Sequence, residues 1–391
     1  MKIIFYCQYV WGMGHFIRSL EFTRALSDHD VTLIAGGQEV EVDLPEHVRL
    51  LRLPVLYMDE KFTRLIPGIP GQSVEQIQHE RKKTIYSLME HLQPDFFIVE
   101  LYPFGRSMFG FELEPLLEDI REGRFGYVKT VCSLRDILVE KKDPLAYEEK
   151  VLQKLNRHFG ALLIHSDPGL LRLEETFTRV KDIKIPVVYT GFITQQTDPA
   201  NGRSLRRELA ISCEQKFIVA SAGGGRSGYK LLTTVIDACE LLRDRLPVRL
   251  EVFTGPFMEN EEFEKLSART SAGFRIRRYT KRFLDYLYAA DLSVSLAGYN
   301  TCMNLLVTRV PALVYPYARQ REQPMRVNKI KNMLPMKVLD EEDVQPDRLS
   351  DQIVRMLDQK RALKTLPIDI NGAANSANFL SRWVNERTDR L

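Results

Sequence analysis

The sequence predicts an α/β protein built from two doubly wound domains, each with a parallel sheet. Short apolar runs alternate with amphipathic segments, which is the pattern of βαβ units. The alternation breaks at the polar stretch 194–204, which holds Pro199 and Gly202, and resumes at residue 216. The 391 residues suffice for two or three domains, since a domain has about 150 residues.

In the first domain, a strand at the N-terminus leads into a helix whose apolar residues, among them Phe16 and Leu20, recur at spacings of three and four. The further predicted elements are strands at 31–35, 48–53, 96–99, 127–131 and 161–164, a helix at 74–92 and a helical segment around 116–120. The Pro- and Gly-rich stretch 54–73 is predicted to be an exposed loop.

The second domain repeats this alternation. Its predicted elements are strands at 216–220, 249–254, 274–278, 292–296 and 312–315, a helix carrying Leu232 and Val235, and a helical tail at 373–390. The carboxyl ends of parallel strands share one edge of a sheet, where ligands of such proteins bind. We therefore expect the functional residues in the loops that follow these strands.

Composition restricts the function. Hydrophobic residues make up 44% of the chain and charged residues 27%, as in ordinary globular proteins. The formal charge of +3 does not indicate a nucleic-acid partner. Five cysteines without a C-x-x-C pair predict reduced thiols in the cytoplasm. No apolar run is long enough to span a membrane, so we expect at most peripheral membrane contact.

One loop of the second domain has the pattern strand, glycine turn, helix start. Gly298 allows a sharp turn and close approach of a ligand, and Asn300 or Thr301 is a candidate N-cap. The start of a helix favours an anion, although an ordinary βα turn has the same pattern. Two companion loops, 221–226 and 319–323, also follow apolar runs. Together the three loops predict one nucleotide-binding site.

The glycine triplet Gly223, Gly224 and Gly225 suits a phosphate, and Arg226 adds a fixed positive charge. The triplet is weak evidence alone, because it lacks a Walker Lys-Ser/Thr and is not a G-x-G-x-x-G motif. No metal is predicted, because the chain has no H-E-x-x-H or paired Cys/His arrangement. The acidic run 340–343 is interpreted as a solvated surface.

In the first domain, His15 follows Gly12 and Gly14 at a helix start and could act as a general base. Arg18 shares its helix face. Glu100 and Asp136 follow neighbouring strands and could orient the base or bind an acceptor. Each of these residues also fits a capping, packing or ion-pair role.

The chain resembles GT-B glycosyltransferases of the group similar to the peptidoglycan N-acetylglucosaminyltransferase MurG. The segment Gly12-Met13-Gly14-His15 resembles that group's G-x-G-H loop, in which the histidine is the proposed base. By the same resemblance, the glycine triplet meets the donor phosphate. The remaining donor contacts implied by the resemblance are Tyr279, Thr280 and Phe283 for the base, and Gly298, Tyr299, Asn300, Thr301, Glu322 and Gln323 for the sugar and ribose.

This resemblance implies a GT-B fold with an acceptor domain at 1–193, a nucleotide-sugar domain at 194–372 and a helix at 373–391 that packs back on the first domain. It implies an inverting transferase that needs no metal or cofactor and moves a sugar, expected from a UDP-sugar, to an acceptor hydroxyl. The acceptor could be a saccharide, a lipid-linked molecule or a small molecule.

One position departs from the group. Where its members carry a carboxylate for the ribose, this chain has Asn304, so the charge-assisted bonds are lost and Glu322 could replace them. Two alternatives stay open. A nucleotide-sugar hydrolase or epimerase could use the same fold, and a non-catalytic protein could bind a nucleotide sugar without turnover.

Overall fold

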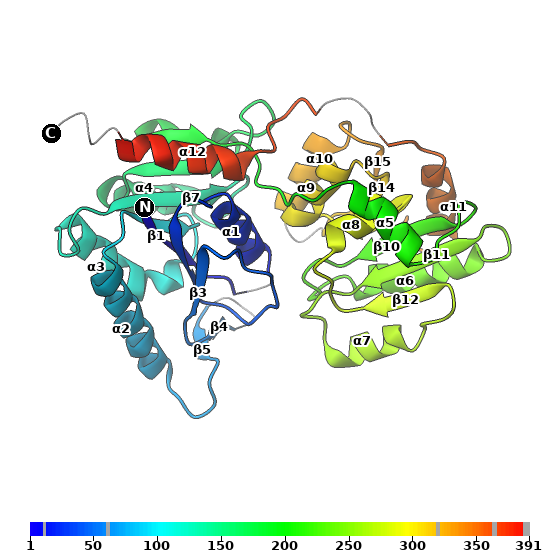
Figure 1. Ribbon diagram of the computed structural model, residues 1–391, viewed down its shortest axis with the longest axis horizontal. Helices are drawn as coiled ribbons and strands as arrows, with labels where there is room; N and C mark the ends of the chain where they lie inside the picture. Colours follow the sequence, from blue (N-terminus) through cyan, green and yellow to red (C-terminus); the bar gives the residue numbers. More distant parts are fainter. Residues whose placement is uncertain (11–12, 60–62, 318–320, 362–365, 386–391) are drawn as a thin grey trace. The chain divides into compact units, whose positions relative to one another are not determined.

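The computed structural model describes residues 1–10, 13–59, 63–317, 321–361 and 366–385. The chain divides into two compact units (Figure 1). The first combines Met1–Ile193 with Ile368–Leu391, and the second is Thr194–Pro367. The division after residue 193 coincides with the predicted boundary, whereas the chain rejoins the first unit at Ile368, before the predicted residue 373.

A parallel sheet of seven strands, in the order β3-β2-β1-β6-β7-β8-β9, forms the centre of the first unit. Its strands are β1 Lys2–Cys7, β2 Asp30–Ala35, β3 Val48–Arg52, β6 Phe96–Glu100, β7 Lys129–Arg135, β8 Ala161–His165 and β9 Val187–Tyr189. Its helices are α1 Gly14–Arg24, α2 Val74–Leu92, α3 Gly110–Arg121, α4 Pro144–His158 and α12 Gly372–Asn385, with short 3-10 turns η1 Ser107–Phe109, η2 Leu173–Glu175 and η3 Val180–Asp182.

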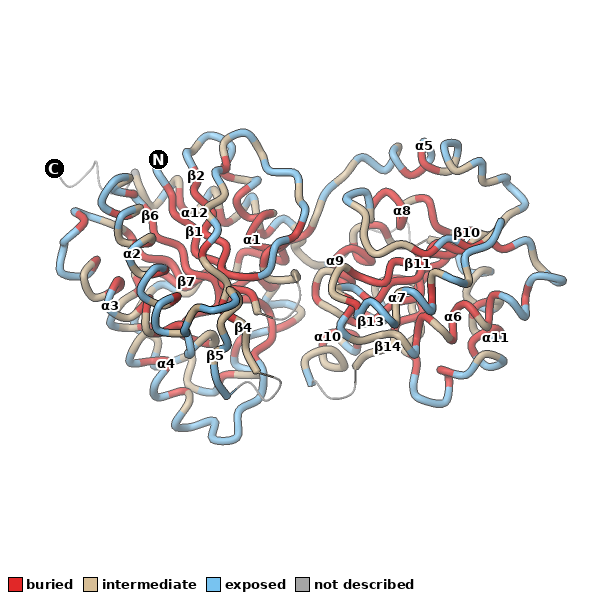
Figure 2. Tube along the Cα trace, turned by 90° about the horizontal axis from the view of Figure 1, so that it is seen from below, coloured by how far each residue is buried: buried red, intermediate tan, exposed pale blue. Residues whose placement is uncertain are grey.

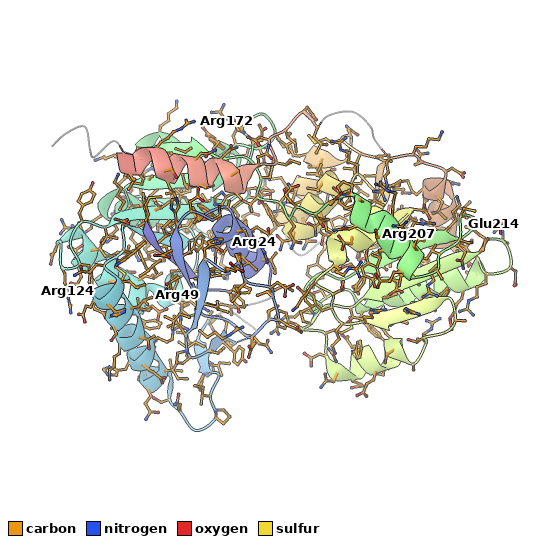
Figure 3. All side chains as sticks on the ribbon, viewed as in Figure 1. Arg24, Arg49, Arg124, Arg172, Arg207 and Glu214 are labelled. Atoms are coloured by element: carbon orange, nitrogen blue, oxygen red, sulfur yellow. The ribbon has the colours of Figure 1, made fainter. Side chains whose placement is uncertain are left out.

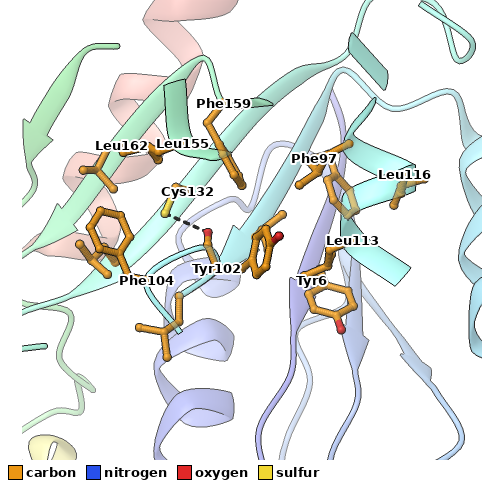
Figure 4. Packing of buried hydrophobic residues seen from close by; sticks show 14 of the residues in the cluster. Tyr6, Phe97, Tyr102, Phe104, Leu113, Leu116, Cys132, Leu155, Phe159 and Leu162 are labelled. Atoms are coloured by element: carbon orange, nitrogen blue, oxygen red, sulfur yellow. Dashed lines mark hydrogen bonds between the residues drawn. The ribbon is translucent and has the colours of Figure 1, made fainter. Parts of the chain in front are cut away.

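Alternate residues of the strands face opposite sides of this sheet. Tyr6 and Phe97 belong to the core with Leu113 and Leu116 of α3 (Figure 4). Phe5 instead packs edge-to-face on Phe22 of α1, with ring centroids 5.3 Å apart. Both faces are covered, which explains why the strands read as continuous apolar runs.

The C-terminal helix α12 packs on the first unit, as predicted, where it contacts α1. Leu380 is fully buried, and the ring of Trp383 lies 5.8 Å from that of Phe96. The ammonium of Lys129 sits 4.9 Å from the centre of the Trp383 ring, a cation–π contact. This helix therefore completes the hydrophobic core of a unit that begins more than 350 residues earlier in the chain.

The stretch 54–73 is more regular than its composition predicts. It contains an antiparallel hairpin, β4 Leu56–Met58 and β5 Leu65–Pro67, and ends in a capping box in which Ser73 and Gln76 bond reciprocally at the start of α2. Leu56 packs with Ile77 and Phe109 in a small hydrophobic cluster. Tertiary packing thus orders a segment for which the sequence predicts an exposed loop.

The second unit has a parallel sheet of six strands in the order β12-β11-β10-β13-β14-β15. Its strands are β10 Lys216–Ser221, β11 Val248–Phe253, β12 Phe274–Arg277, β13 Leu292–Leu296, β14 Ala312–Tyr315 and β15 Met336–Val338. Its helices are α5 Ala200–Glu208, α6 Tyr229–Leu241, α7 Asn260–Ser267, α8 Phe283–Ala289, α9 Tyr299–Thr308, α10 Glu322–Ile330 and α11 Pro346–Leu357.

Helix α5 begins inside the polar stretch 194–204, where the predicted alternation of strands and helices breaks. It packs on α8, where a Cβ atom on Gly202 would lie 2.6 Å from Cβ of Tyr288. Arg206 of α5 donates to the carbonyl of Ala289 and pairs with Asp291. These contacts, which short-range sequence patterns do not reveal, make the polar segment helical.

The central strands of each sheet are buried within their own unit (Figure 2), whereas the edge strands β3, β9 and β15 are partly exposed. Charged side chains lie on separate elements, for example Arg49 on β3 and Arg207 on α5 (Figure 3). Within the described residues, no helix is both long and apolar enough to cross a membrane.

Candidate active site

Each sheet has one point where the strand order reverses. In the first unit β1 lies between β2 and β6, so the connections leave in opposite directions from the carboxyl ends of β1 and β6. In the second unit the reversal lies between β10 and β13. Ligands of open α/β sheets bind at such switch points. His15 and Glu100 lie at the first, and Gly223 and Gly298 lie at the second.

At the first switch point, His15 and Arg18 on the first turns of α1 meet Glu100 at the end of β6. His15 Nδ1 lies 2.7 Å from Glu100 Oε1, and Arg18 Nη2 donates to the same oxygen. The side chains of Arg18 and Glu100 are 3% and 1% exposed, whereas that of His15 is 15% exposed. Only the histidine of this trio is therefore accessible to a ligand.

Burial and the neighbouring charges set the protonation state of His15. Burial raises the pKa of Glu100, but His15, Arg18 and Arg106 outweigh it and lower that pKa to about 2. Burial, together with Arg106 and Arg18, lowers the pKa of His15 to about 3 against the opposing effect of Glu100. An ionised carboxylate can only accept, so Nδ1 of the neutral imidazole carries the proton. Nε2 then presents a lone pair, as a general base requires.

Asp136 does not join this trio. Among the described residues, His15 contacts Glu100 and Arg18 but not Asp136. Asp136 is fully buried, and its Oδ1 accepts the backbone N–H of Ile137 in the turn after β7. Of the predicted glycines, Gly14 is the first residue of α1 and Gly12 lies outside the described residues.

The glycine triplet in the second unit has a stronger conformational role than the sequence indicates. Gly223 and Gly225 have φ values of 62° and 97°, a region that favours glycine. Their N–H groups bond inside the loop, to Ser221 Oγ at 3.1 Å and to the carbonyl of Ala222 at 3.3 Å. A Cβ atom on Gly255 would lie 2.4 Å from the carbonyl carbon of Gly224. The triplet therefore permits close packing of the loops after β10 and β11.

The N-terminus of α9 brings the loops after β10 and β13 together. Cβ atoms placed on Gly223 or Gly298 would each lie 3.9 Å from Thr301 Oγ1. The N-cap is Gly298, and not Asn300 or Thr301 as predicted, because the helix begins at Tyr299. The glycine N-cap has no side chain with which to cap this end, where the positive end of the helix dipole favours an anion.

Asn304 lies one turn further along α9 and is 4% exposed. Its Nδ2 is 3.5 Å from Gln195 Oε1, at the limit of a hydrogen bond, and its Oδ1 has no partner among the described residues. A buried amide oxygen without a partner carries a desolvation cost that a ligand hydroxyl could remove. The predicted contact of Asn304 with the donor stays a prediction.

The other predicted donor residues occupy the same edge of the sheet. Phe283 begins α8 and packs edge-to-face on Phe253, with ring centroids 5.5 Å apart. Tyr279 lies between β12 and α8, and Thr280 Oγ1 accepts the N–H of Arg282 in the same segment. Glu322 begins α10, and Gln323 accepts the N–H of Tyr317 at 2.9 Å. Arg226 is exposed, 5.9 Å from the centre of the Phe257 ring.

Three further residues shape the site: Ser221, which lies in a predicted loop but was given no role, and Gly255 and Gln195, which were not predicted. Ser221 anchors Gly223, Gly255 receives the glycine loop, and Gln195 contacts Asn304. Gly255 could have been found, since it follows a predicted strand in the same way as Gly223 and Gly298. Gln195 could not, because its contact joins residues 109 positions apart.

The chain is similar to known glycosyltransferases. Residues 220–378 match the glycosyltransferase family 28 C-terminal domain. One relative is a UDP-N-acetylglucosamine–N-acetylmuramyl-(pentapeptide) pyrophosphoryl-undecaprenol N-acetylglucosamine transferase of Carboxydothermus hydrogenoformans, 27% identical over 194 residues and covering 48% of each chain. The chain spans about half the length of the curated relatives it matches.

Two solved structures are similar over nearly the whole chain. TcCGT1 in complex with UDP has a TM-score of 0.61 at 14% identity, covering 97% of this chain and 94% of that one. The UDP-GlcNAc 2-epimerase of Methanocaldococcus jannaschii has a TM-score of 0.60 at 11% identity, covering 98% and 100%. The protein therefore has the GT-B fold. Residues 220–378 are similar to the C-terminal domain of glycosyltransferase family 28, which agrees with the predicted resemblance to glycosyltransferases.

Proposed function

We propose that this protein is an inverting glycosyltransferase that moves a sugar from a nucleotide sugar, of the UDP class, to an acceptor hydroxyl. The observation that carries the proposal is the meeting of Gly223, Gly298 and Thr301 at the glycine N-cap of α9, inside the segment that matches the family 28 C-terminal domain. The family 28 domain and the complex of the structurally similar TcCGT1 with UDP support the choice of donor.

In this proposal, the first unit supplies the base. Nε2 of neutral His15 takes the proton of the acceptor hydroxyl, and the resulting oxygen attacks the anomeric carbon of the donor sugar. The bond from that carbon to the diphosphate oxygen breaks, and the nucleoside diphosphate leaves with the electron pair. A single displacement inverts the anomeric configuration. Glu100 holds the imidazole and stabilises the imidazolium that forms.

The second unit would bind and stabilise the leaving group. The dipole at the start of α9 and the Arg226 guanidinium can offset the charge on the diphosphate oxygens. We therefore propose catalysis without a metal or cofactor. Turnover should persist in excess chelator, and loss of activity that magnesium or manganese restores would contradict this part of the proposal.

The first experiment is a thermal-shift series of the full chain with nucleoside diphosphates and nucleotide sugars. A ligand at a hundred times its dissociation constant stabilises the fold by about 2.7 kcal/mol. We expect UDP and a UDP-sugar to raise the Tm, and NMR of the product should show the inverted anomer. A shift without turnover on any acceptor would favour a non-catalytic binding protein, and the absence of any shift would contradict the donor site.

An epimerase is the second candidate, because the similar epimerase structure shares the fold over its full length. Incubation with UDP-N-acetylglucosamine alone separates the two activities. Epimerisation alters the sugar while it stays attached to UDP or after its release, whereas a transferase leaves the donor intact without an acceptor.

The five free thiols, four of them buried, fit the reducing cytoplasm that we propose as the location.

A further inference from the structure

Three cationic side chains lie near one another, and one of them, Arg106, acts on the charge of His15. Arg106 ends the loop 101–106 after β6, Arg135 ends β7, and Lys141 belongs to the loop between β7 and α4. All three follow strands at the edge of the sheet that holds Glu100. They come from segments that the predicted site does not include.

Arg106 is held in an unusual backbone conformation. Its φ is 59°, and that of Leu101 at the other end of the loop is 67°. Few residues other than glycine adopt this region, and such residues concentrate at functional sites. Arg106 Nε donates to the carbonyl of Gln8 at 2.7 Å, which fixes the half-buried guanidinium beside the end of β1. The donors on its two Nη atoms have no acceptor among the described residues.

Lys141 is held against the same loop through Tyr147. The Tyr147 hydroxyl donates to the carbonyl of Phe104 at 2.7 Å, and the Lys141 ammonium lies 5.3 Å from the centre of the Tyr147 ring. Burial, Arg106 and Arg135 all lower the pKa of Lys141. Within the described part of the chain, no carboxylate lies within ion-pair distance of Arg106 or Lys141.

The acidic groups nearby are already engaged. Glu100 bonds to His15 and Arg18, Asp136 bonds to the backbone of Ile137, and Asp143 caps α4 by accepting from Ala146. Glu100 attracts Arg106 but already bonds to His15 and Arg18, so positive charge is in excess where Arg106 and Lys141 repel one another. An anionic ligand would offset that excess, and a guanidinium fork suits phosphate or carboxylate oxygens.

We propose that Arg106 and Lys141 form an anion subsite of the acceptor, so that the hydroxyl presented to His15 belongs to a molecule carrying a phosphate or carboxylate group. This inference rests on the proposed transferase function and narrows its acceptor class. Arg135, which donates from Nε to the carbonyl of Ile137, adds positive charge behind the pair. Neutral saccharides would bind here more weakly than their acidic counterparts.

The test is calorimetric titration of the full chain, saturated with UDP so that the donor site is occupied. The probes are glucose, glucose 6-phosphate, glucuronate and inorganic phosphate. The variants are Arg106→Gln combined with Lys141→Met, and Lys142→Met as the matched control on the same loop. We expect at least one sugar anion to bind the parent and the control more tightly than glucose does. The same anion should bind the double variant about tenfold more weakly than the parent, since charge-assisted bonds are lost.

The outcomes distinguish an anion on the acceptor from a free ion, and they distinguish failure of the subsite from failure of the transferase proposal. Preference for glucose 6-phosphate or for glucuronate identifies the anion on the acceptor, whereas phosphate binding equal to that of both sugars shows that the subsite takes a free ion and overturns an acceptor role. Equal affinities in parent and double variant, or no binding of any anion, also overturn the subsite. The UDP titration reports on the donor site independently, so its failure would count against the transferase alone.

Discussion

His15 is the residue on which the proposed chemistry depends. Replacement by Gln removes the base while leaving a side chain of similar reach. We expect kcat to fall by roughly 10² to 10⁴-fold, the usual contribution of a general base, with donor affinity unchanged. Steady-state kinetics and UDP titration measure the two quantities. A His15→Gln enzyme with parental kcat would show that another group takes the proton.

The environment of His15 sets the pH profile. A free imidazole would lose its base function below its ordinary pKa of about 6.5. Here burial and the neighbouring arginines lower the pKa to about 3, so the imidazole stays neutral in mild acid. We expect kcat/KM to stay level from pH 7.5 down to about 5. A fall of kcat/KM centred near pH 6.5 in the parent enzyme, which disappears when Glu100 or Arg106 is replaced, would contradict this assignment.

The same shift has a consequence for stability. His15 and buried His165 both have pKa values lowered to about 3, chiefly by burial. In the unfolded chain they bind protons near pH 6.5, while in the folded chain they do not. The unfolded state therefore binds more protons, and the free energy of unfolding falls as pH drops from about 6.5 toward 3. Denaturant titrations at pH 7.5 and 5.0 measure this loss, and equal values would refute it.

Two glycines of the second unit offer a matched pair of substitutions. At Gly298 the backbone is extended, with φ of −63°, and a Cβ would meet only Thr301 Oγ1 at 3.9 Å. At Gly255, φ is 89° and a Cβ would lie 2.4 Å from backbone atoms. We expect Gly298→Ala to weaken donor binding with little change in Tm, because the methyl group occupies ligand space. Gly255→Ala should lower the Tm by several degrees, since its backbone strain costs about 1 kcal/mol or more.

At the scale of elements, we expect α12 to contribute to the stability of the first unit. Trp383 covers Gly160, packs against Phe96 and receives the Lys129 ammonium. Because Trp383 is only partly buried, we expect Trp383→Ala to destabilise the first unit by about 2–3 kcal/mol, below the 3–5 kcal/mol of a fully buried tryptophan. The control is Leu145→Ala in α4, since Leu145 is 70% exposed and should change stability by less than about 0.5 kcal/mol.

Calorimetry would resolve this prediction, provided that the two units give separate transitions. The Trp383→Ala substitution should lower the transition temperature of the first unit and leave that of Thr194–Pro367 unchanged. A uniform fall of both transitions, or none, would show that α12 contributes to stability in another way.

The elements show which sequence patterns are reliable. Long periodic segments such as 74–92 and apolar strands such as 292–296 were predicted at their observed positions, because their burial follows from local spacing. Helix α4 was missed, although Val151 and Leu155 have helical spacing and are buried. The hairpin at 54–73 and helix α5 escaped prediction for another reason. Their order depends on partners distant in sequence, Ile77 and Phe109 for the hairpin and Tyr288 for the helix.

At the scale of the whole molecule, the sequence predicted the architecture better than the state of the candidate site. The two doubly wound domains and the gathering of loops at sheet edges follow from the alternation of strands and helices, and the family resemblance added the GT-B fold. The protonation state of His15 does not follow from this alternation, because it depends on burial and on Glu100 and Arg106, which lie 85 and 91 positions further along the chain. Asn300 and Thr301 were wrongly predicted as the N-cap because glycine, which caps only through its backbone, already occupies that position.

The return of α12 to the first unit also decides the order in which the chain can fold during synthesis. The ribosome completes Thr194–Pro367 before it makes residues 372–385, so the unit encoded second is the first whose residues are all available. The first seven-stranded sheet must wait, with the surface around Phe96 and Lys129 uncovered, until translation has passed the entire second unit. At about 5–20 residues per second that interval lasts roughly ten seconds or more, a period in which a chaperone could occupy the place of the helix.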